Sequence, residues 1–158
     1  MWSLIASTVQ SEFADAADVE QVTRLVTRLA LAALLGGVLG YEREHQGKAA
    51  GIRTHMLVAM GASLFVLVPQ QAGMSMPDLS RVIQGIVAGI GFLGAGAIIK
   101  LRSEENVRGL TTAAGVWMTA AIGIACGLGR EATAVISTLM ALLILAGVPR
   151  VFDRTRPN

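Results

Sequence analysis

Long apolar stretches alternate with short polar loops along this chain. A membrane-spanning helix needs about 20 mostly apolar residues, within a range of about 17 to 25. Five stretches follow this pattern and predict an all-α integral membrane protein with five transmembrane helices. The predicted helices cover residues 25–41, 56–72, 82–99, 110–128 and 132–149. Together they form one transmembrane domain over residues 22–149.

The two ends of the chain lack such stretches. Residues 1–21 carry apolar side chains at nearly helical spacing from Trp2 to Phe13, and acidic residues follow them. A secretory signal would begin with basic residues, so we predict an interfacial amphipathic segment instead. Residues 150–158 form a short basic tail, expected in the cytoplasm.

The composition agrees with a lipid surrounding. Hydrophobic residues make up 53% of the chain and charged residues only 15%, whereas about a quarter of a typical soluble protein is charged. So few charges would leave the surface of a soluble protein of this size largely apolar. The net charge of +2 is small and is spread over short loops, which argues against nucleic acid as a partner.

Lysine and arginine residues concentrate in alternate loops. With five helices, nine of them lie on one side of the membrane and four on the other. The nine are Arg43, Lys48, Arg53, Lys100, Arg102, Arg108, Arg150, Arg154 and Arg156; the four are Arg24, Arg28, Arg81 and Arg130. Because cytoplasmic loops carry the excess of basic residues, we predict the N-terminus outside and the C-terminus in the cytoplasm. Arg28 is expected to reach the headgroups from the start of its helix.

The densest group of polar residues follows the first predicted helix. Glu42 and Arg43 come directly after an apolar stretch, where a charge must pair or reach the interface. One interpretation is an ion pair between Glu42 and Arg53 or Arg108 that ties helix ends together. The alternative is a divalent-cation site with Glu42 and Glu44 as weak candidates, because Mg²⁺ prefers oxygen ligands. Apart from Mg²⁺, no cofactor is expected.

Other polar residues have mainly structural interpretations. Thr54 and Thr111 are placed to cap the second and fourth helices through their hydroxyls, and Thr112 belongs to the same polar group. Gln84, in the outer third of the third helix, is expected to hydrogen bond to another helix. Cys126 is expected to be a small packing residue.

The sequence contains no recognisable catalytic set. His45 and His55 lack metal-ligand spacing, and we treat both as non-ligands. There is no glycine-rich phosphate loop, nucleophile elbow or Ser/His/Asp arrangement. The sequence therefore does not argue for an enzyme.

Glycines recur at spacings that favour close helix contacts. A glycine has no side chain, so two backbones can approach each other closely. The candidates for helix packing are Gly36, Gly40, Gly85, Gly89, Gly91, Gly94, Gly96, Gly123 and Gly127. They predict tight packing and a homodimer or small homo-oligomer. The alternative is a third helix that is unwound near the bilayer centre and exposes carbonyls to a cation.

Several of these motifs occur in the same order in one known family. The most specific are Gly-Ile-Gly-Phe-Leu-Gly-Ala-Gly at residues 89–96 and Val-Arg-Gly-Leu-x-Thr-Ala-Ala at residues 107–114. Further matches are residues 35–43, 50–54, 84–88, 120–123 and 126–129. Over about residues 28–148 the chain resembles the MgtC/SapB family of bacterial membrane proteins.

This resemblance implies an inner-membrane protein linked to growth in low magnesium and, in pathogens, to virulence and survival inside macrophages. Some members resemble regulators of the membrane-embedded ATP synthase, which makes the ATP synthase a candidate partner. Family positions that carry polar residues correspond to Glu42, Arg43, Arg53, Thr54, Gln84, Arg108 and Cys126. Two readings remain open: a non-enzymatic regulator that binds other helices, and a transporter or channel for Mg²⁺ or another cation.

The sequence departs from the family pattern in three respects. Many members carry an ACT-like domain after the last helix, whereas this sequence ends nine residues past Pro149, so we expect a transmembrane domain only. His55 and Thr111 occupy positions where the best-known member has asparagine. An asparagine-specific role is therefore not expected here.

Overall fold

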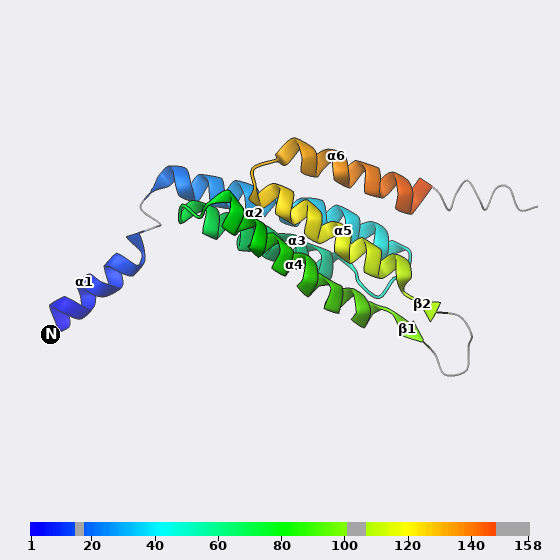
Figure 1. The fold of residues 1–158 in the computed structure, drawn as a ribbon, viewed down its shortest axis with the longest axis horizontal. Coiled ribbons are helices and arrows are strands. Elements are labelled where there is room, and N and C mark those ends of the chain that lie inside the picture. The colour runs from blue at the N-terminus through cyan, green and yellow to red at the C-terminus, as the bar shows by residue number, and fades with distance from the viewer. Residues whose placement is uncertain (15–17, 101–106, 148–158) are drawn as a thin grey trace, which may run out of the picture.

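The structure is a computed structural model of the chain, and it describes residues 1–14, 18–100 and 107–147. Helices dominate it, and α2 to α6 pack side by side as a bundle in Figure 1. The bundle helices are α2 (Val19–His45), α3 (Ile52–Gln71), α4 (Met76–Ala97), α5 (Leu110–Gly127) and α6 (Glu131–Leu142). The prediction of an all-α membrane protein is confirmed.

Four smaller elements belong to the described chain. Helix α1 (Trp2–Glu12) buries none of its residues and lies apart from the bundle in Figure 1. Strands β1 (Ile99–Lys100) and β2 (Val107–Arg108) form a short antiparallel pair after α4. A π-helical turn, η2 (Leu143–Gly147), extends α6.

Each predicted helix corresponds to one observed helix, but α2, α3 and α4 each begin several residues earlier than predicted. Capping side chains account for the early starts of α2 and α4. Helix α2 starts at Val19 because the carboxylate of Asp18 accepts hydrogen bonds from the backbone N–H groups of Glu20 and Gln21. Helix α4 starts at Met76 because the hydroxyl of Ser75 caps it. Polar capping signals therefore extend both helices beyond their apolar stretches.

Four helices, α2 to α5, are long and apolar enough to cross a membrane. The segment Glu131–Gly147 is apolar but shorter. The predicted helix over residues 132–149 extends past residue 147, and the last part of that prediction, like the basic tail, lies outside the described residues. The number of spans and their orientation stay predictions.

The connections that carry most basic residues lie at one end of the bundle. Figure 1 shows the α2–α3 loop and strands β1 and β2 at that end, and the α3–α4 and α5–α6 connections at the other. This arrangement is the one that the predicted sidedness requires. We refer to the two ends as the cytoplasmic and outer ends on that basis.

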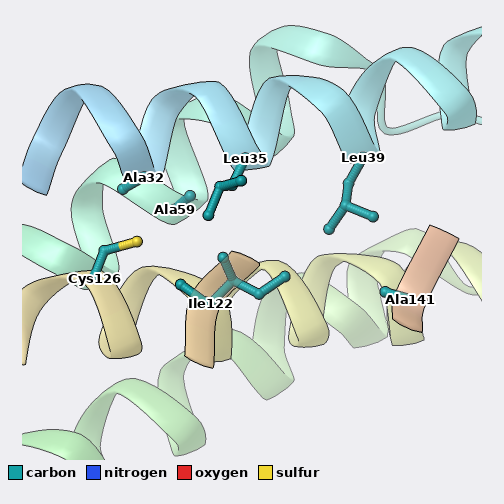
Figure 2. Packing of buried hydrophobic residues seen from close by; sticks show 8 residues of the cluster. Ala32, Leu35, Leu39, Ala59, Ile122, Cys126 and Ala141 are labelled. Carbon is teal, nitrogen blue, oxygen red and sulfur yellow. The ribbon is translucent and has the colours of Figure 1, made fainter. Parts of the chain in front are cut away.

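Helix α5 lies in the middle of the bundle and contacts α2, α3, α4 and α6. Its packing is made of small and medium side chains, as Figure 2 shows. The cluster contains Ala32, Leu35, Leu39, Ala59, Ile122, Cys126, Ala134 and Ala141. Many large apolar side chains instead point outwards; Phe92 on α4, for example, is 83% exposed. An apolar exterior of this kind suits lipid rather than water.

Candidate functional site

Glycines bring α2 directly against α3. A β-carbon on Gly36 would lie 2.6 Å from the carbonyl oxygen of His55, and one on Gly40 would lie 2.6 Å from the Cα of Ile52. Real β-carbons do not approach other atoms so closely, so both positions require glycine at this helix separation. The α2–α3 contact at the cytoplasmic end therefore depends on these two residues.

A second glycine pair brings α5 against the opposite part of α3. A β-carbon on Gly123 would collide with the carbonyl oxygen of Ala59, and one on Gly127 would lie 2.5 Å from the carbonyl oxygen of Ser63. Helix α3 is thus held between two glycine faces. This is the close backbone approach that small residues permit in membrane helices.

The glycines of α4 behave differently. Among the described residues, no atom outside the adjoining helix backbone lies within 4 Å of a β-carbon built on Gly85, Gly89, Gly91 or Gly96. A β-carbon on Gly94 would make only an ordinary contact, 3.7 Å from the Cβ of Ala113. Most glycines of α4 therefore have no packing partner within the described part of the chain.

Two of these glycines line a groove between α3 and α4. The groove has a volume of about 580 Å³ and is almost entirely apolar. Gly61 of α3 faces Gly85 and Gly89 of α4 across it, and Leu57 and Leu93 contribute further apolar lining. The backbone of α4 is an unbroken α-helix from Met76 to Ala97. The alternative of an unwound helix at these glycines is therefore wrong for this structure.

A polar cluster lies between α2, α3 and α5 at the cytoplasmic end. Arg43 donates a hydrogen bond from Nη1 to Oε2 of Glu42 at 3.3 Å, and both side chains are largely buried. His55 is fully buried, and its Nδ1 lies 3.0 Å from the carbonyl oxygen of Gly51. Because a carbonyl can only accept, Nδ1 carries the hydrogen.

Three polar atoms of this cluster have no hydrogen-bond partner among the described residues. They are Oε1 of Glu42, Nε of Arg43 and Nε2 of His55. The two nitrogen-bearing side chains face α5 where it has no side chain. A β-carbon on Gly115 would lie 3.6 Å from Nε2 of His55 and 4.0 Å from Cδ of Arg43. Buried polar atoms without partners are costly, and their concentration here defines the candidate functional site.

The structure changes the partners that sequence reasoning gave to these residues. Glu42 pairs with Arg43 rather than with Arg53, which is exposed at the start of α3. Oε2 of Glu44 accepts a hydrogen bond from the backbone N–H of Ile52 at 2.9 Å, so this carboxylate caps α3. The predicted pairing of Glu42 with Arg53 is therefore wrong.

The predicted threonine caps are also absent. Gly51 and Gly109 are the N-cap residues of α3 and α5, and neither helix has a side-chain cap from a threonine. Thr54 and Thr111 are exposed, one residue or more inside their helices. A cap must come before the first helical residue, and both threonines follow it.

The described residues offer no geometry that supports the predicted metal site at Glu42 and Glu44. No group of three or more His, Cys, Asp or Glu side chains is close enough there to hold a metal ion. Glu44 is engaged as a helix cap and Glu42 as the partner of Arg43. The two weak candidates therefore do not form a joint site.

The remaining candidates occupy three different environments. Arg108 ends strand β2, and Thr112 is 3% exposed on the first turn of α5. Cys126 is fully buried in the apolar cluster of Figure 2, as a packing residue would be. Gln84 lies on an exposed face of α4, next to the groove glycine Gly85.

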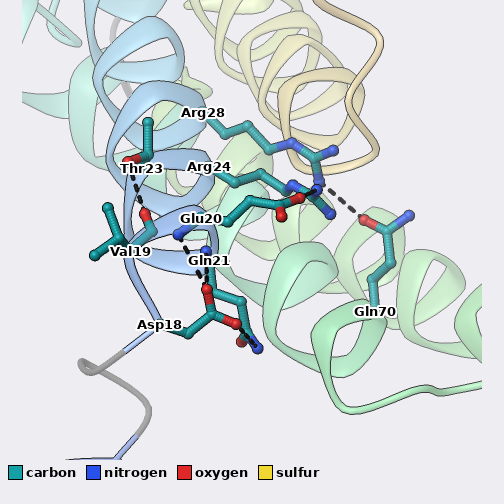
Figure 3. Close-up of polar contacts among 8 residues, drawn as sticks. All are labelled: Asp18, Val19, Glu20, Gln21, Thr23, Arg24, Arg28 and Gln70. Atoms are coloured by element: carbon teal, nitrogen blue, oxygen red, sulfur yellow. Dashed lines mark hydrogen bonds and ion pairs between the residues drawn. The ribbon is translucent and has the colours of Figure 1, made fainter.

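Sequence reasoning missed a second polar site at the outer end of the bundle. Figure 3 shows Arg28 pointing inwards to Gln70. Its Nη1 donates hydrogen bonds to Oε1 of Gln70 at 3.0 Å and to the carbonyl oxygen of Gly127 at 2.8 Å. Its Nε lies 3.8 Å from the carboxylate of Glu131. Arg28 thus joins α2, α3, α5 and α6, while its reach to the headgroups stays a prediction.

The fold and these sites define a class: a multi-helix membrane protein whose helices are held by glycine contacts and by one polar cluster at each end. Residues 29–154 match the MgtC family, and the chain belongs to that family. No solved structure matches the chain.

Three relatives show the extent of the similarity. Protein SrpB of Synechococcus elongatus is 46% identical over 78% of this chain and 74% of its own length. The putative magnesium transporter YhiD of Escherichia coli is 42% identical over 76% of this chain and 58% of its own. Protein MgtC of Brucella abortus is 47% identical over 75% and 48%, respectively. The chain thus matches only about half of the length of the YhiD and MgtC relatives.

Proposed function

We propose that this chain is a non-enzymatic protein of the bacterial inner membrane that acts by helix–helix contact and supports growth when magnesium is scarce. The observation that carries the proposal is the groove between α3 and α4. Gly61, Gly85 and Gly89 line it without any side chain packed on the two α4 glycines. Such surfaces are typical contact sites of membrane helices.

The first occupant of this groove in the proposal is a second copy of the chain. Gln84 lies beside the groove on an exposed face and has no hydrogen bond to the described residues. An amide in lipid needs a partner, and it both donates and accepts. In a dimer with a two-fold axis near this position, Gln84 of one copy meets Gln84 of the other copy. Gln84 is therefore self-complementary in a dimer formed by α4.

The dimer is tested by energy transfer between donor-labelled and acceptor-labelled copies in liposomes. A β-carbon at position 89 would meet no described atom within 4 Å. Gly89→Leu should therefore be tolerated on α4 while its side chain fills the groove, and it should abolish most of the transfer. Gly91→Leu is the matched control, because Gly91 is equally open but does not line the groove. Equal transfer in wild type and Gly89→Leu would contradict the proposed contact.

The wider partner in the proposal is a larger membrane complex, with the ATP synthase as the candidate that the family suggests. Support comes from family membership and from the apolar exterior of α4, on which Phe92 stands out. Affinity purification from native membranes tests it. The ATP synthase should copurify with wild type and less with Gly89→Leu; its absence from both would contradict this partner.

Cation transport is the competing function, and one relative bears the name putative magnesium transporter. The unbroken α4 and the separate engagement of Glu42 and Glu44 give it no structural support in the described residues. Purified protein in liposomes with an enclosed Mg²⁺ indicator decides between the two. The proposal predicts no flux, and a flux that Glu42→Ala removes would overturn it.

A further inference from the structure

A second cavity lies at the cytoplasmic end, where α4 ends and α5 begins. It has a volume of about 540 Å³ and is formed by the loop after α2, the last residue of α4 and the first turn of α5. Lys48, Ala97, Arg108, Gly109 and Thr112 are among its lining residues. It is separate from the apolar groove between α3 and α4.

The described lining of this cavity favours a negative ligand. Lys48 and Arg108 are basic, and none of the lining residues is acidic. The cavity also adjoins the start of an 18-residue helix that has no side-chain cap. The first N–H groups of a helix lack partners within it, and the helix dipole places partial positive charge there.

Thr112 provides an independent observation. It is 3% exposed and lines the cavity, yet its hydroxyl makes no hydrogen bond to a described residue. The other buried threonines satisfy their hydroxyls within their helices. Thr119 donates to the carbonyl oxygen of Gly115 at 2.9 Å, and Thr138 donates to that of Ala134 at 2.8 Å.

Thr112 has no equivalent partner because of its place in the helix. The residue four positions before it is Arg108, which belongs to strand β2 and not to the helix. The hydroxyl is thus left available to a ligand in the cavity. Thr112 therefore presents to the cavity a hydroxyl that has no hydrogen bond among the described residues, where a ligand can reach it.

The backbone around Gly109 fixes the shape of the cavity. Gly109 has a positive φ of 96°, and a β-carbon there would collide with the carbonyl oxygen of Ala97. Only glycine suits both constraints. The tight turn holds the start of α5 against the end of α4, and Thr112 and Arg108 line the cavity together with Lys48.

We propose that this cavity binds a phosphate group. A phosphate offers several acceptor oxygens for Lys48, the Thr112 hydroxyl and the N–H groups of the first turn of α5. The position at the cytoplasmic end of the spans gives two sources for such a group: the headgroup of an anionic phospholipid and free inorganic phosphate.

The test uses the full chain, with native mass spectrometry after reconstitution in phosphatidylcholine nanodiscs that contain phosphatidic acid or phosphatidylglycerol. Wild type should retain the anionic lipid selectively. Lys48→Gln should retain about tenfold less, because a charge-assisted hydrogen bond is lost. Arg53→Gln is the matched control, since this exposed arginine lies near the same end and does not line the cavity; it should retain as much as wild type.

Two further arms distinguish the sources and the mechanism. Millimolar inorganic phosphate should displace the lipid if free phosphate is a ligand, and should leave it bound if the headgroup is the specific ligand.

Thr112→Val keeps the charge and the shape of the cavity lining, so reduced lipid retention in this variant shows recognition by the hydroxyl rather than general electrostatic attraction. Helix content by circular dichroism verifies that each variant folds. Retention without preference for anionic lipid and no phosphate binding would overturn the proposal, as would equal losses in Lys48→Gln and Arg53→Gln.

Discussion

The guanidinium group of Arg28 donates a hydrogen bond to the carbonyl oxygen of Gly127, 2.8 Å away and 99 positions further along the chain. This carbonyl ends α5, where helix carbonyls lack partners within the helix. Arg28 also binds Gln70 at the end of α3, as Figure 3 shows. These two hydrogen bonds join the outer end of α2 to those of α3 and α5, and the ion pair with Glu131 adds α6.

Arg28→Ala should lower the free energy of unfolding by about 2 kcal/mol, because hydrogen bonds to a charged group are lost in a partly buried place. The measurement is unfolding in mixed micelles with increasing denaturing detergent. Arg24→Ala is the matched control, one turn earlier on α2. Its ion pair with Glu20 is half exposed, so a loss of no more than about 0.5 kcal/mol is expected. Similar losses in both variants would count against the role of Arg28.

Gly123→Ala should destabilise the bundle by about 1 to 3 kcal/mol, since the added methyl group collides with the backbone of α3 at Ala59. Gly91→Ala places the same methyl group in open space on α4. It should be neutral or slightly stabilising, because alanine favours helix more than glycine does. Thermal unfolding in detergent compares the two. A stable Gly123→Ala would show that α5 and α3 lie further apart than described here.

The Glu42–Arg43 pair should show strong non-additivity. Glu42→Gln leaves the buried guanidinium of Arg43 without its counter-charge, at a cost of about 3 kcal/mol. The double variant Glu42→Gln/Arg43→Met removes both charges and should cost less than the sum of the two single variants by more than about 1 kcal/mol. A double-mutant cycle of unfolding free energies measures this, and strict additivity would mean that the two charges do not interact.

The stability of the first turn of α2 should depend on pH. Backbone and side-chain hydrogen bonds from Gln21 hold the pKa of the Asp18 carboxyl below its ordinary value of 3.8. A lowered pKa in the folded state means that the stabilisation is present above pH 3.8 and is lost as the pH falls through the folded value. Hydrogen exchange at the amides of Glu20 and Gln21 should therefore accelerate, relative to the intrinsic rate, below about pH 4. In Asp18→Asn this added pH dependence should disappear; if it persisted, another group would be responsible.

The helices could be predicted because apolar stretches of membrane length are a strong signal. Their ends could not, because they depend on caps. Asp18 and Ser75 begin α2 and α4 several residues before the apolar stretches start. Helix α3 begins after Gly51, with a carboxylate from Glu44 as its cap. That cap comes from eight residues earlier in the chain, which a local capping rule does not cover.

The candidate site was predicted only in part. Glu42 and Arg43 stand out in the sequence as charges beside an apolar helix, but their mutual pairing depends on burial under α5 at Gly115. His55 was set aside because its spacing does not suit a metal, and its burial follows only from the packing of three helices. Its place four residues after Gly51, directly before an apolar stretch, was the available signal.

The sequence likewise does not show which glycines pack against another helix of the chain and which line the groove. Gly36 and Gly123 contact α3 within the chain, whereas Gly85 and Gly89 line a groove. All four have similar sequence surroundings. Only the arrangement of the helices shows which glycines are used inside the bundle and which remain for another helix.

The most direct test of contact through α4 is photocrosslinking from single positions in native membranes. A photoreactive phenylalanine analogue replaces Leu93, which lines the groove and is 51% exposed, or Leu139 on α6, which is 55% exposed. We expect a covalent dimer of the chain from position 93 and none from position 139. Crosslinks to lipid alone from position 93, or equal dimer from both positions, would contradict the account.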